Sequence, residues 1–157
     1  LDAGCCDASA PPESRRGKLR RVIARDRELL MPVQMEWEPH GVRSRFFGTV
    51  TATDLLHHVR EVCRHPDFRD LRFSILDFRD ATDAVDDAGL PEVKSELIGS
   101  QYSNPGILVA AITVDRKVIG HLTRFIGLGV LNRQIQVFST PEAAMDWIAE
   151  QSTFLLH

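Results

Sequence analysis

From about Met31 onward, strand-like and helix-like segments alternate along the chain with short connections between them. The strands are predicted from period-2 alternation or from short apolar runs, at residues 33–38, 42–50, 71–78, 107–114 and 134–138. Helical periodicity follows each strand after the first, and strands that alternate with helices form largely parallel sheets. The sequence therefore predicts one α/β domain in the order β-β-α-β-α-β-α-β-α. It contains a single five-stranded mixed, mostly parallel sheet and about four helices.

The helix boundaries have signals of their own. Thr51-Ala52-Thr53-Asp54 matches the capping-box pattern, and Pro66 ends the first helix because the residue before a proline avoids helical geometry. A second helix is predicted from about Gly89 to Tyr102. The last helix is expected to begin at Pro141, since proline favours the first helical position.

The first thirty residues differ from the remainder. They hold seven basic and five acidic residues, with turn formers and little periodicity, whereas residues 31–157 hold twelve basic and seventeen acidic ones. We expect residues 1–30 to be an N-terminal extension that is disordered or partly helical, and residues 31–157 to form the domain. An acidic domain is a poor partner for nucleic acid. No apolar run approaches the ~20 residues that span a bilayer, so a cytoplasmic location is expected.

Signatures of catalysis and of cofactor binding are missing from the sequence. The three cysteines, Cys5, Cys6 and Cys63, form no CxxC pair and no zinc-site spacing with the histidines. Glycine-rich phosphate loops and a G-x-S-x-G elbow are also missing. We therefore expect no enzymatic activity, no cofactor and no metal. The histidines, His58 and His65 included, are expected to be surface imidazoles.

A dense polar cluster follows the third predicted strand, in the segment expected to be the loop before the second helix. Its members are Asp77, Arg79, Asp80, Thr82, Asp83, Asp86 and Asp87. Ligands of α/β sheets sit at the carboxyl ends of parallel strands, where this segment lies. Three interpretations remain open: a solvated loop that caps the next helix, a docking edge for a partner, and a carboxylate site for a divalent cation.

The chain resembles the STAS family, and within it the branch similar to the sporulation protein SpoIIAA. Three segments, in order, match that branch: a glycine that closes the second strand before a helix start, a "dP.f..l...l.D.r" segment, and a "vF....eAl.WL" ending. They lie at residues 47–55, 65–80 and 137–148. The resemblance covers about residues 33–150 and implies the SpoIIAA-like fold.

Antagonists of anti-sigma factors in this family carry a D-S-S-G-L signature whose second serine is phosphorylated. The matching segment here is Asp86-Asp87-Ala88-Gly89-Leu90, with alanine at the phosphoacceptor position. The resemblance therefore implies a partner-binding edge that includes Ala88 and Gly89 but has no hydroxyl switch, which puts sigma-factor regulation itself in doubt.

Two functions are carried forward. The first is a non-enzymatic interaction module. It would bind a protein partner, or a second copy of itself, through the polar cluster and the second helix. The alternative, implied by the similarity of this branch to CRAL-TRIO domains, is binding of a small apolar molecule or lipid. An unfilled apolar cavity beneath the second helix would favour the ligand, whereas a solid core with an exposed apolar patch would favour docking.

Overall fold

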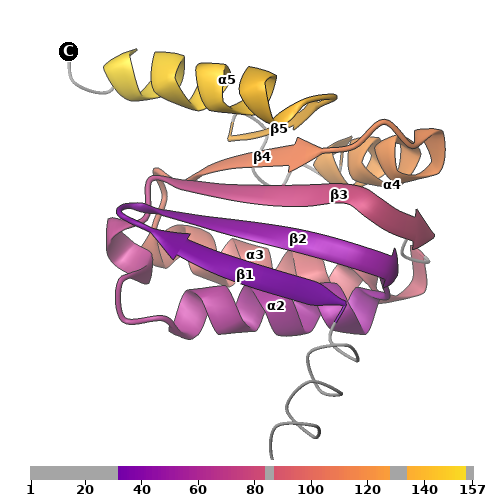
Figure 1. Cartoon of the computed structure of the whole chain (residues 1–157). Coiled ribbons are helices and arrows are strands. Elements are labelled where there is room, and N and C mark those ends of the chain that lie inside the picture. Colours follow the sequence, from indigo (N-terminus) through magenta and orange to yellow (C-terminus); the bar gives the residue numbers. More distant parts are fainter. Residues whose placement is uncertain (1–31, 84–86, 128–133, 155–157) are drawn as a thin grey trace, which may run out of the picture. The chain divides into compact units, whose positions relative to one another are not determined.

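The computed structural model describes residues 32–83, 87–127 and 134–154; the side chains of Asp83, Asp87 and Phe154 are not described. The predicted extension at 1–30 lies outside these ranges. The elements are β1 (Val33–Glu38), β2 (Gly41–Thr49), α2 (Ala52–Arg64), η1 (Phe68–Asp70), β3 (Phe73–Asp83), η2 (Asp87–Gly89), α3 (Leu90–Ser103), β4 (Leu108–Ile112), α4 (Arg116–Gly127), β5 (Ile135–Phe138) and α5 (Pro141–Phe154) (Figure 1).

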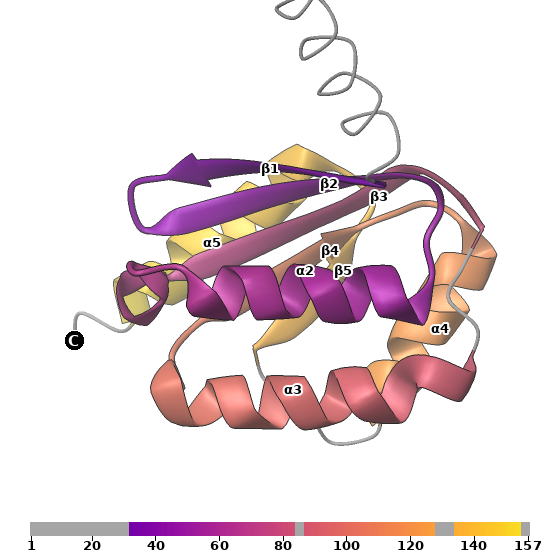
Figure 2. The same ribbon diagram turned by 90° about the horizontal axis from the view of Figure 1, so that it is seen from below.

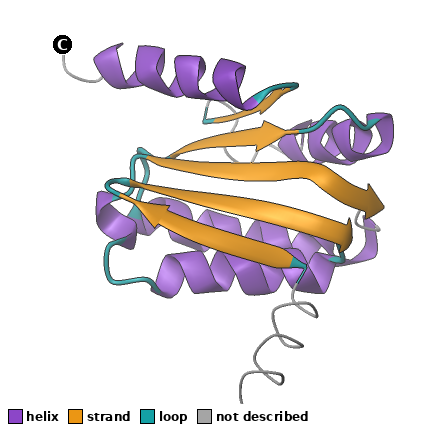
Figure 3. Ribbon diagram, in the orientation of Figure 1, coloured by secondary structure: helices purple, strands orange, loops and turns teal. Residues whose placement is uncertain are grey.

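The five strands form one mixed sheet in the order β1-β2-β3-β4-β5 (Figure 3). β1 runs antiparallel to β2, and the remaining neighbours are parallel. The hairpin turns at Pro39 and His40, and His40 adopts the left-handed conformation with φ 64°. α2 and α3 lie side by side on one face of the sheet, and α5 lies on the other (Figure 2). The predicted fold class and element order are confirmed.

The third strand is longer than predicted. β3 continues five residues beyond Phe78 to Asp83, because β2 extends to Thr49 and pairs with it as far as Asp83. The pairing has two register shifts, between Arg45 and Phe47 and between Gly48 and Thr49, and at each of them β3 contributes one extra residue. Gly48 has a φ of +62°, which only glycine adopts without strain. Arg79 to Asp83 therefore belong to a strand and not to the loop that the sequence predicted.

The helix signals are confirmed at the first and last helices. Thr51 Oγ1 accepts a hydrogen bond from the backbone N–H of Asp54 at 3.2 Å, and the Asp54 carboxylate accepts one from the N–H of Thr51 at 2.8 Å. This reciprocal pair satisfies two backbone donors that a helix start leaves without a partner. His65 caps the end of α2, and α5 begins at Pro141.

The core has two layers, one on each face of the sheet. On the face of α2, α3 and α4, the rings of Phe46 and Phe78 stack with centroids 4.5 Å apart. On the other face, Trp147 and Ile148 of α5 pack against Ile75 and its neighbours in the central strands. Successive residues of a strand point to opposite faces. In β3 up to Phe78, even-numbered positions therefore face α2 and α3, and odd-numbered ones face α5. Beyond the first register shift the order reverses, and Ala81 packs in the core on the α2 and α3 face.

A buried asparagine connects the end of α3 to the segment before β3. The Nδ2 group of Asn104 donates hydrogen bonds to the carbonyls of Phe68 and Leu71, each at 2.8 Å. Buried carbonyls need such donors because water cannot reach them. This contact holds η1 against the amino-terminal side of the sheet, opposite the end that carries the predicted site.

Candidate functional site

Three charged residues of the predicted cluster, Asp77, Arg79 and Asp80, take part in two ion pairs on the α5 side of the sheet. Arg79 contacts Asp77 through its guanidinium at 2.7 Å, and Arg45 of β2 contacts Asp80 at 2.5 Å. The Arg45 guanidinium also lies over the ring of Phe47, 5.0 Å from its centroid. These pairs are largely exposed, so water screens them and they add little to stability.

Asp77 is the more buried of the two carboxylates in these ion pairs. Burial alone would raise its pKa, but hydrogen bonds from the side chain and backbone of Arg79, together with the positive charge of Arg79, outweigh it and lower the pKa. Asp77 therefore remains ionised and engaged with Arg79 at neutral pH. Arg79 thus holds the charged carboxylate of Asp77 on the surface of the sheet.

Of the remaining predicted site residues, those that the structure describes lie close to the entrance to α3. Thr82 and Ala88 are exposed, and Gly89 precedes the first residue of α3. Asp86 lies outside the described residues, and Asp83 and Asp87 are described only by their backbone. Since Asp83 pairs with Thr49 and Gly89 packs on Ala52, the entrance lies beside the start of α2. Ala88 thus occupies the helix entrance, as the resemblance implied.

Gly89 has a steric requirement for glycine. A Cβ at this position would collide with the Cβ of Ala52, and neither atom can rotate away. We predict that Gly89→Ala lowers the free energy of unfolding by about 2 kcal/mol, as overpacked positions do. Chemical denaturation measures this difference.

Gly99, an exposed helical glycine of α3 with nothing near its Cβ position, is the matched control. Gly99→Ala is expected to raise stability by up to about 1 kcal/mol, the difference in helix propensity. Equal effects of the two substitutions would contradict the close contact between η2 and α2.

The outer face of α3 is largely uncharged. Ser95, Ile98 and Tyr102 follow one another at three- and four-residue spacing and are exposed, Ile98 to 40% and Tyr102 to 88%. Pro91 extends the same stripe back to the entrance at Ala88. We call these five residues the α3 surface. Large side chains such as Tyr102 cost little conformational entropy when a partner buries them.

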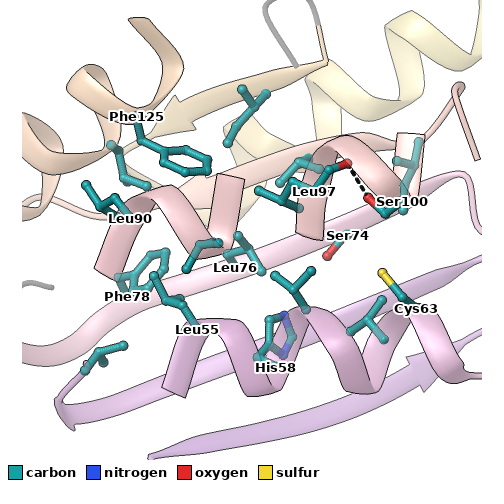
Figure 4. Close-up of a pocket in the computed structure, with 18 of the residues that line it drawn as sticks. Leu55, His58, Cys63, Ser74, Leu76, Phe78, Leu90, Leu97, Ser100 and Phe125 are labelled. Atoms are coloured by element: carbon teal, nitrogen blue, oxygen red, sulfur yellow. Dashed lines mark hydrogen bonds between the residues drawn. The ribbon is translucent and has the colours of Figure 1, made fainter. Parts of the chain in front are cut away.

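A cavity of about 120 Å³ lies between the sheet and the helices α2, α3 and α4. Figure 4 shows Leu55 and His58 of α2 facing Leu97 and Ser100 of α3 across it, with Ser74 and Leu76 of β3 behind. Protein interiors rarely leave voids much larger than a water molecule. By the criterion set from the sequence, this cavity favours a ligand. The exposed face of α3 meets only one of the two conditions set for docking, because the core beneath it is not solid.

His58 contradicts the expectation of a surface imidazole. Its side chain is 5% exposed, lines the cavity, and meets the ring of Phe46 edge-on with centroids 5.3 Å apart. Burial lowers its pKa from 6.5 to about 4, so the imidazole is neutral at pH 7. Nδ1 is buried and has no hydrogen-bond partner.

A signal for His58 was present in the sequence. Leu55, Val59 and Val62 lie one helical turn from it or next to it on the same apolar stripe of α2. His57, one position earlier, falls on the outer face and is exposed. His65 also differs from a free surface imidazole, because it stacks on Trp37 at 3.7 Å between ring centroids.

Comparison with known proteins supports the fold by structure alone. No protein-family model matches the sequence, and no curated protein is detectably similar to it. Phosphorylated SpoIIAA, a cell fate determinant of Bacillus, matches with a TM-score of 0.51 and 14% identity over 74% of this chain and 98% of that one. The chain has the SpoIIAA-like STAS fold.

Two further structures show the same fold. A putative anti-sigma factor antagonist from Thermotoga maritima matches with a TM-score of 0.52 and 16% identity, over 74% of this chain and 94% of that one. An uncharacterised SpoIIAA-like protein of the DUF3478 family from Shewanella loihica matches with a TM-score of 0.50 and 12% identity, over 74% and 91%. At sequence identities this low, the similarity establishes a shared fold and nothing more.

Neither a metal centre nor a membrane span is found within the described ranges. Among those residues, no three histidines, cysteines or acidic side chains lie close enough together to hold a metal ion. None of the helices described is both long and apolar enough to span a bilayer. The α3 surface and the cavity are therefore the two candidate functional sites among the described residues.

Proposed function

We propose that residues 31–157 form a non-enzymatic protein-interaction module that docks a partner through the α3 surface and the adjoining end of β3. The observation that carries this proposal is the uncharged, exposed outer face of α3, which begins at Ala88 and includes Ile98 and Tyr102. Interfaces are depleted in charge at their centres and enriched in tyrosine.

The structural neighbours support a regulatory role of this kind. Two of them are described as SpoIIAA and as a putative anti-sigma factor antagonist. In this chain the helix entrance carries Ala88, which has no hydroxyl group to phosphorylate. Docking would therefore be constitutive at this position, or controlled elsewhere, and the partner need not be an anti-sigma factor.

A charge introduced at the entrance tests the docking surface. We expect Ala88→Glu to reduce retention of the partner by about tenfold or more, because it buries an unpaired carboxylate at the interface. Immobilised full-length protein would be used to enrich bound proteins from cell extract. Quantitative mass spectrometry would then compare wild type and variant.

Ala143 provides the matched control. It is also exposed in the first turn of a helix, but α5 lies on the opposite face of the sheet. Ala143→Glu adds the same charge and should retain what the wild type retains. Loss of the same proteins from both variants, or from neither, would contradict docking at α3.

A second candidate function is binding of a small molecule, and the cavity favours it. Its volume of about 120 Å³ is well below the roughly 300–1,000 Å³ of pockets for drug-sized ligands, so a lipid does not fit without rearrangement. An engineered apolar cavity of about 150 Å³ takes up benzene. The cavity therefore suits a molecule of about that size.

A further inference from the structure

The wall of the cavity excludes charged ligands. Its lining contains no lysine, arginine, aspartate or glutamate, and most of its surface is aliphatic or aromatic. A charge moved into such a wall would lose its hydration without gaining a partner. The occupant is therefore neutral and mostly apolar.

The wall contains five residues with polar side-chain groups, namely His58, Cys63, Ser74, Ser100 and His121. The Ser100 hydroxyl donates to the carbonyl of Leu97 at 2.7 Å and also contacts the thiol of Cys63, whose pKa is raised by burial. Nδ1 of His58 has no partner. Ser44 Oγ is the other described side-chain atom that is buried and unsatisfied, but Ser44 is not part of the cavity wall.

A buried polar atom without a hydrogen-bond partner lowers stability. A leucine at position 58 would fill the same face of α2 without leaving such an atom. The His58 ring reaches from α2 toward the cavity that lies between the helices and β3 (Figure 4). A hydroxyl group can donate to an unprotonated imidazole nitrogen or accept from a protonated one, so it satisfies either tautomer. A hydrocarbon can do neither.

We propose that the cavity binds one small neutral molecule, of roughly six to eight non-hydrogen atoms, whose single hydroxyl group hydrogen-bonds to Nδ1 of His58. This proposal deepens the second candidate function and rests on it. It is independent of docking at the α3 surface, because the cavity lies on the inner side of α3.

Phenol and toluene are probes of nearly equal shape that differ in the hydroxyl group. Titration calorimetry or ligand-observed NMR would measure the affinity of each for the full chain and for His58→Leu. The phenol-to-toluene affinity ratio is expected to fall about tenfold in His58→Leu, the value of a buried hydrogen bond that one partner has lost. Ser74→Ile, which fills the cavity from β3, is expected to bind neither probe.

The outcomes distinguish two claims: that the cavity binds a small molecule, and that His58 hydrogen-bonds to it. If both probes bind and the ratio is the same in wild type and His58→Leu, the assignment to His58 is wrong, but the cavity remains a ligand site. If neither probe binds the wild type, the ligand-binding candidate falls as well, and docking is unaffected.

A second readout covers a His58→Leu protein that fails to fold. In the wild type, the ¹⁵N chemical shift of His58 Nδ1 should move when phenol is added and stay nearly constant with toluene. Equal shifts with both probes, or no shift with either, would overturn the proposal.

Discussion

Phe46→Ala is expected to lower the free energy of unfolding by about 4 kcal/mol, the range for a buried phenylalanine that leaves a cavity. Phe46 is 0% exposed, stacks on Phe78 and meets the edge of His58. It joins β2 to both β3 and α2, so its removal weakens three elements at once. Denaturation with urea, followed by circular dichroism, measures the change.

The neighbouring phenylalanine is the matched control. Phe47 points to the opposite face of the sheet, is partly exposed and is covered by Arg45. Phe47→Ala should cost about 1 kcal/mol, since less apolar surface is uncovered. Equal losses for the two variants would contradict the assignment of faces along β2.

The free energy of unfolding is expected to fall by about 3 kcal/mol between pH 6.5 and pH 4 through His58 alone. The unfolded chain binds a proton on this histidine near pH 6.5, whereas the folded chain does so only at about pH 4. Over that window the unfolded state holds more protons, and stability therefore decreases as the pH falls. Below it, the lowered pKa of Asp77 adds a further loss in the same direction.

His58→Leu should remove the contribution of His58, so that the free energy of unfolding changes less with pH above pH 4. The comparison is made by urea denaturation at pH 7, 5.5 and 4.2. His57→Leu, on the exposed face of the same helix, controls for the loss of an imidazole from α2. If both variants keep the wild-type slope, His58 is not the buried neutral group described here.

Periodicity alone was enough to predict the order of elements. In the apolar run predicted at residues 107–114, Ile107 to Thr113 are buried, as in a strand covered on both faces, whereas Val114 is 68% exposed. Adjacent residues of a strand point to opposite faces, and Phe46 and Phe47 follow this rule. The capping box at Thr51 was predictable because its hydrogen bonds involve residues close together in the chain.

Features that depend on tertiary contacts were not predictable. The charged residues after Phe78 read as a loop, because the sequence does not show that this part of β3 pairs with a long β2 and has a solvated face. Whether the predicted site residues of β3 and η2 bind a partner stays a prediction. The cavity depends on how far α2 and α3 stand from the sheet, which no local pattern encodes.

The measurement that tests docking most directly is hydrogen exchange of the full chain, free and bound to the protein that the wild type retains. We predict that the amides of η2 and α3, from Ala88 to Tyr102, exchange more slowly in the complex, while those of α5 are unchanged. Protection confined to α5 or to the β1 edge, with α3 unaffected, would show that the partner binds elsewhere and would contradict the proposed function.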